Sequence, residues 1–227
     1  FLAVDVFFVL SGYLMAQLYN QGTLLDFYKR RTKRLLPAYL VVLSLTIFFV
    51  SFVAVAVDAN QLYNQLIFNL LGMSNIGLWF HNSYFDATSF KPLLNLWSIG
   101  VEIQYYLIVP LLLPLLRRKY LLLLAVILFS LLLTFYVTSI SPKTSFYLLP
   151  FRIWEFLLGA VAAWSFPSLA NKERGLIPSI LSVAALLSMM FYPIKVESLN
   201  IFNGHPGLAA LIISLITVFI LIRPLHK

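Results

Sequence analysis

The sequence contains no cysteine and little charge. Of its 227 residues, 11% are charged and 61% are hydrophobic, and the mean hydropathy is +0.92. Soluble domains carry roughly 25% charged residues, so this chain has too little charge to cover a water-exposed surface. The absence of cysteine excludes thiol nucleophiles and thiolate metal sites. This composition predicts an integral membrane protein.

Acidic residues are the scarcer charged type, with 8 Asp and Glu against 16 Lys and Arg and a formal net charge of +8. In a soluble protein this excess would suggest nucleic acid, but here the basic residues cluster at the ends of apolar runs. We therefore expect membrane lipid, and no nucleic acid, as their partner. The sequence opens at Phe1 inside an apolar run, without a signal-peptide pattern, so we expect a truncated chain.

The apolar runs predict an all-α, polytopic helical bundle with about seven transmembrane helices, because a helix needs about 20 residues to cross the hydrocarbon core. The expected spans are Phe1–Tyr19, Leu35–Val57, Leu93–Leu116, Tyr120–Ile140, Pro150–Phe166, Leu176–Pro193 and Pro206–Ile222. The connections rich in Lys and Arg alternate along this series, which predicts that they lie in the cytoplasm. The stretch Gln61–Phe80 is interrupted by asparagines, and we expect an interfacial or re-entrant helix there on the outer face.

Four charged residues fall within expected spans, namely Asp5, Glu102, Arg152 and Glu155. Inserting such a charge costs about 2.5–3.5 kcal/mol, so each is a candidate functional residue. Arg152 and Glu155 have i,i+3 spacing, and Glu102 shares a helix face with Tyr106 at i,i+4. The alternative is that these charges only stabilise the fold, through internal ion pairs such as one between Glu102 and Arg152.

The basic segment Phe27–Pro37 contains Arg31 and Arg34 at i,i+3 spacing. Proline is favoured in a first helical turn, so we expect a helix to begin near Pro37. Two guanidinium groups beside a helix N-terminus would form an anion site, and guanidinium binds phosphate in a bidentate manner. A cytoplasmic, phosphate-bearing donor would fit. The alternative is a purely topological role with attraction to anionic lipid.

Histidine is also scarce. His81 and His205 fall in expected outer-face connections and His226 lies near the C-terminus, where a histidine is more often solvated than catalytic. The sequence contains no metal-ligand pattern, nucleophile elbow or phosphate-binding glycine loop. The residues by themselves therefore indicate a multi-span protein with buried charges and a cytoplasmic anion site.

Four segments resemble the acyltransferase-3 family in order and approximate spacing. They are VDVFFVLSGYLM (Val4–Met15), FYKRRTKRLLP (Phe27–Pro37), LWSIGVEIQYYLIVP (Leu96–Pro110) and LPFRIWEFLLGA (Leu149–Ala160). The family has ten spans, so the resemblance implies that residues 1–227 are a partial membrane acyltransferase domain, from the second span to the eighth. It further implies transfer of an acyl group, usually acetyl, from cytoplasmic acyl-CoA to hydroxyls of extracytoplasmic carbohydrate at a bacterial inner membrane.

The resemblance also assigns roles to residues. Arg31 and Arg34 match the family's Arg-x-x-Arg element, which handles the CoA donor. Glu102 and Asp5 match carboxylates that would support catalysis, while Arg152 and Glu155 match an Arg-x-x-Glu element. We expect these last two residues and Tyr106 to line a substrate cavity, and we expect no metal.

Two departures from the family pattern bear on activity. The family's catalytic base is a histidine of its first span, which would lie upstream of Phe1, so we expect this chain by itself to be inactive. Many relatives also have histidine where this chain has Asn95.

Two other functions stay open from the sequence. One is a transporter or flippase whose midplane charges form a substrate path, and the other is a structural subunit without catalytic activity.

Overall fold

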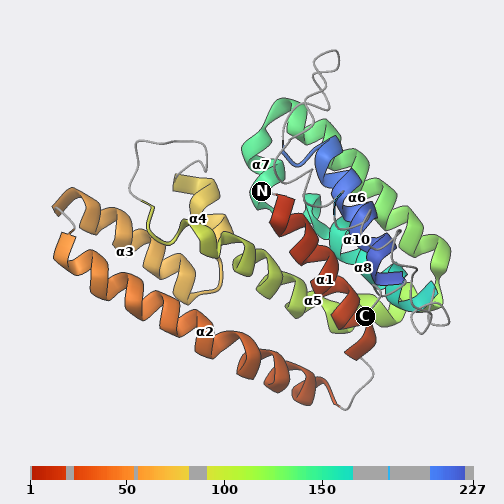
Figure 1. The fold of residues 1–227 in the computed structure, drawn as a ribbon, viewed down its shortest axis with the longest axis horizontal. Coiled ribbons are helices and arrows are strands. Elements are labelled where there is room, and N and C mark those ends of the chain that lie inside the picture. The colour runs from red at the N-terminus through yellow and green to blue at the C-terminus, as the bar shows by residue number, and fades with distance from the viewer. Residues whose placement is uncertain are drawn as a thin grey trace. The chain divides into compact units, whose positions relative to one another are not determined.

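The computed structural model describes residues 2–18, 23–53, 56–81, 91–165, 184 and 205–222. In those ranges every regular element is helical, as Figure 1 shows, which confirms the predicted all-α class. The elements are α1 (Leu2–Leu18), α2 (Leu24–Val53), α3 (Ala56–Leu70), α4 (Ser74–His81), η1 (Leu94–Leu96), α5 (Trp97–Arg118), α6 (Tyr120–Ile140), α7 (Pro142–Tyr147), η2 (Leu149–Phe151), α8 (Ile153–Ser165) and α10 (Leu208–Ile222).

Three of the described helices are long and apolar enough to cross a membrane, namely Leu24–Phe52, Leu94–Arg118 and Tyr120–Ile140. Shorter apolar helices occupy three more of the expected positions, at Leu2–Leu18, Ile153–Ser165 and Leu208–Ile222. The expected span Leu176–Pro193 lies outside the described residues, apart from a single position. The helices coincide with the apolar runs because lipid offers no hydrogen-bond partners to the backbone, and a helix satisfies its backbone N–H and C=O groups internally.

The helix expected to begin near Pro37 begins much earlier, so that prediction was wrong. Residues Thr23 and Asp26 form a reciprocal N-terminal cap, in which the Asp26 amide donates to Thr23 Oγ1 at 3.2 Å and the Thr23 amide donates to Asp26 Oδ2 at 3.1 Å. This pair starts α2 at Leu24, and the helix continues through Pro37. A proline inside a helix costs about 3 kcal/mol, but transmembrane helices tolerate it.

The stretch expected to form one interfacial helix contains two. Gly72 lies between α3 and α4 with φ of 67°, a conformation that glycine adopts at little cost. Its amide donates to the Asn69 carbonyl at 2.8 Å, which closes the turn. The two helices have 15 and 8 residues, fewer than the about 20 that a span requires.

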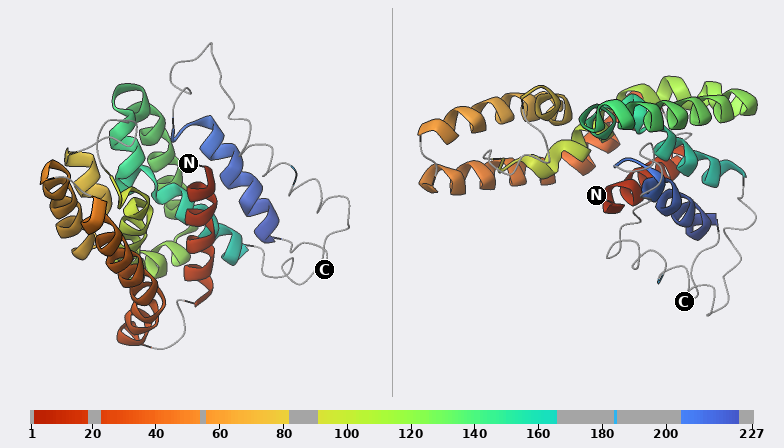
Figure 2. Two further views of the ribbon diagram at one scale, coloured as in Figure 1. Left: turned by 60° about the vertical axis from the view of Figure 1, so that its left-hand side comes forward. Right: turned by 90° about the horizontal axis from the view of Figure 1, so that it is seen from above.

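The chain forms two compact units, of which the first comprises Phe1–Leu18 and Leu111–Lys227. Its centre is the packing of α1 on α8, with α10 against both, as Figures 1 and 2 show. The two helix backbones approach closely at Gly12 and Gly159. A Cβ on Gly12 would overlap the Phe156 carbonyl oxygen, and a Cβ on Gly159 would overlap the Val9 carbonyl oxygen. Small residues allow this approach between helices in membranes.

A polar seam on α6 holds the segment between α7 and α8 and the start of the segment that leads into α10. The seam consists of Ser130, Thr134 and Thr138, which are spaced four apart and therefore share a face. Their hydroxyls lie 2.7, 2.7 and 3.0 Å from the carbonyl oxygens of Pro150, Phe151 and Pro206 respectively. These carbonyls lie outside regular α-helix, where an unsatisfied backbone group would be costly in an apolar medium.

The second unit comprises Tyr19–Pro110 and contains α2, α3, α4 and the first part of α5. Its apolar core joins Tyr39, Leu43, Leu93 and Leu96. Polar contacts fix the surrounding helices: the Tyr39 hydroxyl donates to Asn69 Oδ1 at 2.9 Å, and the Gln104 side chain donates to Asn75 Oδ1 at 2.8 Å. Figure 2 shows α2 and α3 running side by side within this unit.

The close approach of α1 and α8 yields a stability prediction. Gly159→Ala places a methyl group onto a backbone carbonyl that no rotamer change can move, and such overpacking typically costs about 1–3 kcal/mol. We expect a lower thermal unfolding midpoint for the detergent-solubilised full-length protein. Ala3→Val is the control, because it enlarges an exposed residue of the same helix pair. Equal midpoints for Gly159→Ala and wild type would contradict the packing.

Candidate functional site

In the second unit, Arg31 of α2 is a buried arginine with 7% relative exposure. Its guanidinium carbon lies 5.7 Å from the centroid of the Phe27 ring and 5.9 Å from that of Tyr106. Among the described residues no carboxylate lies within salt-bridge distance of Arg31. Its buried Nε–H has no hydrogen-bond partner there. Aromatic faces attract the cation, but they leave its hydrogen-bonding capacity unused.

Arg31 lines a pocket of about 190 Å³ between α2 and the first part of α5. The pocket walls are mainly apolar, with a few tyrosines and the guanidinium as polar groups. The lining residues are Tyr28, Arg31, Thr32, Leu35, Leu36, Tyr39, Ile99, Ile103, Tyr106 and Leu107. The Tyr28 hydroxyl donates to the Leu107 carbonyl at 3.1 Å, joining the two helices across one side of the pocket.

Glu102 is buried in α5, with 2% relative exposure. The Tyr106 hydroxyl donates a hydrogen bond to its Oε1, which confirms that the two residues share a helix face. Because the ring of Tyr106 also faces Arg31, the phenol links the carboxylate to the pocket cation. The alternative partner considered for Glu102, Arg152, instead forms ion pairs in the first unit.

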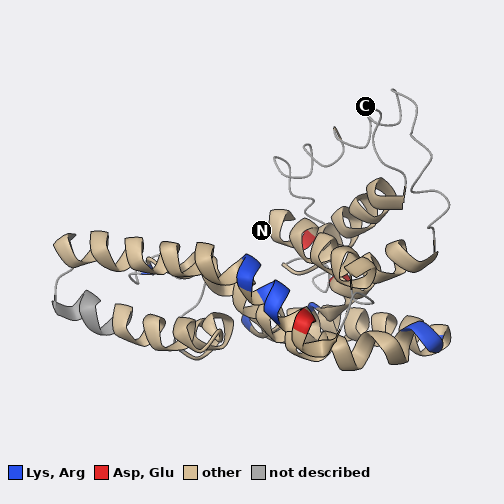
Figure 3. Ribbon diagram, turned by 90° about the horizontal axis from the view of Figure 1, so that it is seen from below, with Lys and Arg blue, Asp and Glu red and all other residues tan. Residues whose placement is uncertain are grey.

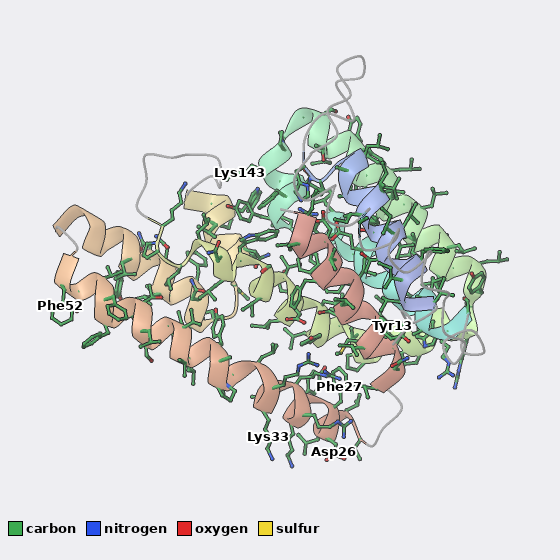
Figure 4. All side chains as sticks on the ribbon, viewed as in Figure 1. Tyr13, Asp26, Phe27, Lys33, Phe52 and Lys143 are labelled. Atoms are coloured by element: carbon green, nitrogen blue, oxygen red, sulfur yellow. The ribbon has the colours of Figure 1, made fainter. Side chains whose placement is uncertain are left out.

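Arg34 is exposed, unlike Arg31, and so are Lys29, Arg30 and Lys33. Figure 3 shows these basic residues gathered in the first half of α2, followed by a long stretch without charge, and Lys33 projects from the helix in Figure 4. The expected pair of guanidinium groups at a helix N-terminus is therefore not formed. Both arginines lie within the helix, and only Arg31 enters the pocket.

The first unit contains a buried ion cluster centred on Arg152. Its Nη1 lies 2.8 Å from Asp5 Oδ1 and 2.8 Å from Glu155 Oε1, and all three side chains have 0% exposure. Arg152 Nε donates to the Phe146 carbonyl at 3.2 Å, and the guanidinium carbon lies 5.3 Å from the Phe146 ring centroid. The i,i+3 prediction for Arg152 and Glu155 is confirmed, and the fold adds Asp5 from α1.

His205 also belongs to this cluster, and sequence reasoning missed it. Its Nε2 lies 3.4 Å from Asp5 Oδ1, and its side chain retains 11% exposure. Burial lowers the pKa of His205, an effect that the nearby Asp5 carboxylate partly offsets. Within the described part of the chain, Asp5 Oδ2 and Glu155 Oε2 are buried without a hydrogen-bond partner. No spacing rule connects residues 200 positions apart, so only the fold reveals this neighbour.

The sequence-predicted site residues thus fall into two groups. Arg31, Glu102 and Tyr106 meet in the second unit, and Asp5, Arg152 and Glu155 meet in the first. The expected substrate cavity of Arg152, Glu155 and Tyr106 remains a prediction, because Tyr106 belongs to a different unit from the other two. Each group combines buried charge with unused hydrogen-bonding atoms, as binding sites for polar substrates do.

Comparison with known proteins identifies the protein family to which the chain belongs. The model of the acyltransferase-3 family, described as an acyltransferase domain, matches residues 1–227. The chain therefore belongs to this family of acyltransferases, which confirms the resemblance seen in the sequence motifs. Its apolar helices and this membership make it a membrane protein. The family also favours an acyltransferase over the transporter considered from the sequence.

Three relatives illustrate the similarity. An uncharacterized protein of Haemophilus influenzae is 34% identical over 212 residues, or 83% of this chain and 86% of that protein. O-acetyltransferase OatA of Staphylococcus aureus is 29% identical over 256 residues, or 100% of this chain and 40% of that protein. Peptidoglycan O-acetyltransferase OatA of Listeria monocytogenes is 32% identical over 214 residues, or 85% of this chain and 34% of that protein. The chain thus spans less than half the length of both acetyltransferases. No solved structure matches.

The ion cluster yields a second prediction. Arg152→Met leaves Asp5 and Glu155 as buried carboxylates without their cation, and breaking a buried pair costs about 3–5 kcal/mol. We expect a large loss of folded full-length protein, measured by thermal unfolding in detergent. Adding Asp5→Asn and Glu155→Gln removes the uncompensated charge and should restore much of the loss. Lys143→Met in α7 is the control, and equal stability of the Arg152 and Lys143 variants would contradict the cluster's role.

Proposed function

We propose that this chain is a membrane acyltransferase domain that transfers an acyl group, in the first instance acetyl, from acyl-CoA to hydroxyls of cell-surface carbohydrate. Family membership supports acyl transfer. The names of two relatives, O-acetyltransferase and peptidoglycan O-acetyltransferase, support acetyl as the group and peptidoglycan as the first carbohydrate to test. Hydroxyl acylation also agrees with the Asp5 and Glu155 carboxylate oxygens that have no hydrogen-bond partner among the described residues.

The observation that carries the donor assignment is the buried Arg31 in its apolar pocket. A buried cation with no carboxylate at ion-pair distance among the described residues is costly, and a phosphate would compensate it through charge-assisted hydrogen bonds, including one from the unused Nε–H. Acyl-CoA combines phosphates with a pantetheine arm of methylene groups and two amides, which fits a mainly apolar pocket with a few tyrosines. Ligand pockets usually measure about 300–1,000 Å³, so a pocket of about 190 Å³ would hold only part of the donor.

The exposed basic residues of α2 would contribute from outside the pocket. Lys29, Arg30, Lys33 and Arg34 create a positive surface near one end of the helix. Such a surface raises the local concentration of an anionic ligand and increases its rate of association. In this proposal Arg31 binds the donor directly, whereas Arg34 only attracts it.

The proposed site of action is a bacterial inner membrane, with the donor side in the cytoplasm and the acceptor outside. The support comes from the basic connections, which lie on one side if the apolar runs alternate across the membrane. The basic first half of α2 and the Arg117–Lys119 connection would then face the cytoplasm. The end of α4, at His81, would face outward.

The donor proposal predicts unequal roles for the two arginines. In the full-length protein, Arg31→Ala should weaken acyl-CoA binding by about 10- to 150-fold, which corresponds to the roughly 1.5–3 kcal/mol of a hydrogen bond to a charged group. Arg34→Ala is the matched control, and an exposed charge contributes at most about 1 kcal/mol. Arg31→Lys should restore only part of the affinity, because it lacks the planar fork. The affinity of all three variants for acetyl-CoA is measured by equilibrium binding. Equal losses of affinity for both alanine variants would refute the pocket assignment.

The orientation is tested by labelling single cysteines in a cysteine-free full-length protein in intact cells. His81→Cys should react with a membrane-impermeant maleimide, whereas Lys119→Cys should react only after the membrane is permeabilised. Labelling of Lys119→Cys from outside would reverse the proposed orientation while leaving the donor pocket itself unaffected.

A further inference from the structure

The pocket around Arg31 contains tyrosines whose phenol hydrogens are already used within the protein. The Tyr28 hydroxyl donates to the Leu107 carbonyl at 3.1 Å. The Tyr106 hydroxyl donates to Glu102 Oε1. A carbonyl or carboxylate oxygen can only accept, so in both bonds the hydrogen comes from the phenol. A phenol oxygen that donates its hydrogen in this way can still accept a hydrogen bond, but it can no longer donate one to a ligand.

The third tyrosine of the pocket, Tyr39, is engaged more completely. Its hydroxyl lies 2.9 Å from both the carbonyl oxygen and Oδ1 of Asn69, and it also interacts with the Ser74 side chain. These contacts join α2 to α3 and α4 within the second unit. Tyr39 therefore holds helices together, and we assign the acceptors of the pocket to Tyr28 and Tyr106 alone.

Few side chains of the pocket can donate a hydrogen bond. Among the described residues that line it, those with N–H or O–H groups besides the tyrosines are Arg31 and Thr32, and the rest are leucines and isoleucines. Arg31 is a buried cation with an unused Nε–H, whereas Thr32 is exposed. The pocket therefore combines one cation with two acceptor oxygens on mainly apolar walls. A ligand that fits carries an anionic group followed by an apolar arm with N–H or O–H groups.

We propose that Tyr28 and Tyr106 determine the specificity for the donor, by accepting hydrogen bonds from the hydroxyl and amide N–H groups of the pantetheine arm while Arg31 binds the adjoining phosphate. This inference rests on the proposed function, which supplies acyl-CoA as the donor. In CoA the phosphate is followed by a dimethyl-substituted carbon, a hydroxyl and an amide. The dimethyl group would contact the leucines and isoleucines of the walls, and the hydroxyl and the amide N–H would reach the tyrosine oxygens.

These acceptors would distinguish the donor from the phosphates of the membrane itself. A guanidinium binds any phosphate, including that of a phospholipid. The acyl chains of a phospholipid are joined to its phosphate through glycerol esters, whose oxygens accept hydrogen bonds but cannot donate them. In this pocket such oxygens would face the oxygens of Tyr28 and Tyr106, and buried polar groups without partners are costly. The tyrosines thus supply a selectivity that Arg31 lacks.

The first test uses the wild-type full-length protein and measures displacement of bound acetyl-CoA by two competitors. One is 4′-phosphopantetheine, which carries a phosphate and the pantetheine arm. The other is hexyl phosphate, which carries a phosphate and an apolar chain without N–H or O–H groups. A hydrogen bond between neutral groups contributes about 2- to 12-fold in affinity, so two of them should favour phosphopantetheine by at least about 4-fold. Equal affinities for the two competitors would overturn the inference.

The second test removes the acceptor oxygens one at a time. Tyr28→Phe and Tyr106→Phe should each weaken binding of 4′-phosphopantetheine by about 2- to 12-fold, with the affinity for hexyl phosphate unchanged because its chain has no hydrogen to donate. Tyr136→Phe is the matched control, since Tyr136 is an exposed tyrosine of α6 that does not line the pocket. Tyr28→Phe leaves the bond between Tyr106 and Glu102 in place, so it carries the test if the Tyr106 variant folds poorly. A loss of affinity that is equal for both competitors, or absent for both, contradicts the assignment.

The inference and the proposed function fail in different ways. If Arg31→Ala binds acetyl-CoA as tightly as wild type does, the donor assignment of the proposed function fails. If Arg31→Ala weakens acetyl-CoA binding but Tyr28→Phe and Tyr106→Phe keep the wild-type preference for 4′-phosphopantetheine over hexyl phosphate, the inference fails and the proposed function stands. Loss of that preference in both phenylalanine variants, with binding of hexyl phosphate intact, is the result that we expect.

Discussion

The buried guanidinium of Arg152 is the interaction on which the first unit depends. It lies between apolar helices, where an unpaired charge would cost several kcal/mol, and it is held by a carboxylate from α1 and another from α8. The break between α7 and α8 places Arg152 there, and the hydroxyl seam of α6 satisfies the carbonyls that this break exposes. Glycines at the α1–α8 contact bring the backbones close enough for the pair to form.

The buried cation of the second unit, Arg31, has different surroundings. Arg31 is surrounded by aromatic rings rather than carboxylates, and its Nε–H has no partner among the described residues. The cost of burying Arg152 is offset by the protein itself, whereas that of Arg31 would be offset by an anionic ligand. Under the proposed function this contrast gives the two groups different tasks: the first would position polar side chains, and the second would bind the donor.

Local sequence rules predicted those features of the site that lie within one helix. The apolar runs predicted the helices, and the i,i+3 and i,i+4 spacings predicted the Arg152–Glu155 and Glu102–Tyr106 contacts. The start of α2 was missed because Pro37 suggests a first turn, while the cap formed by Thr23 and Asp26 is a stronger start signal. That error placed Arg34 beside Arg31 in a site that only Arg31 enters.

Contacts between distant segments could not be predicted in the same way. Asp5, Arg152 and His205 come from widely separated parts of the chain, and no periodicity links them. Charge within expected spans drew attention to Asp5 and Arg152, whereas His205 was interpreted as an ordinary loop histidine. Its position depends on tertiary packing, because Thr138 of α6 binds the adjoining carbonyl and Asp5 faces the ring.

We propose that the pocket around Arg31 holds the phosphate-bearing part of the acyl donor. Photo-crosslinking of the full-length protein with an acyl-CoA analogue that carries a diazirine on the pantetheine arm beside the phosphates tests this proposal. We expect crosslinks in the segments that line the pocket, residues 28–39 and 99–107, and competition by acetyl-CoA. Competed crosslinks confined to other segments would contradict it.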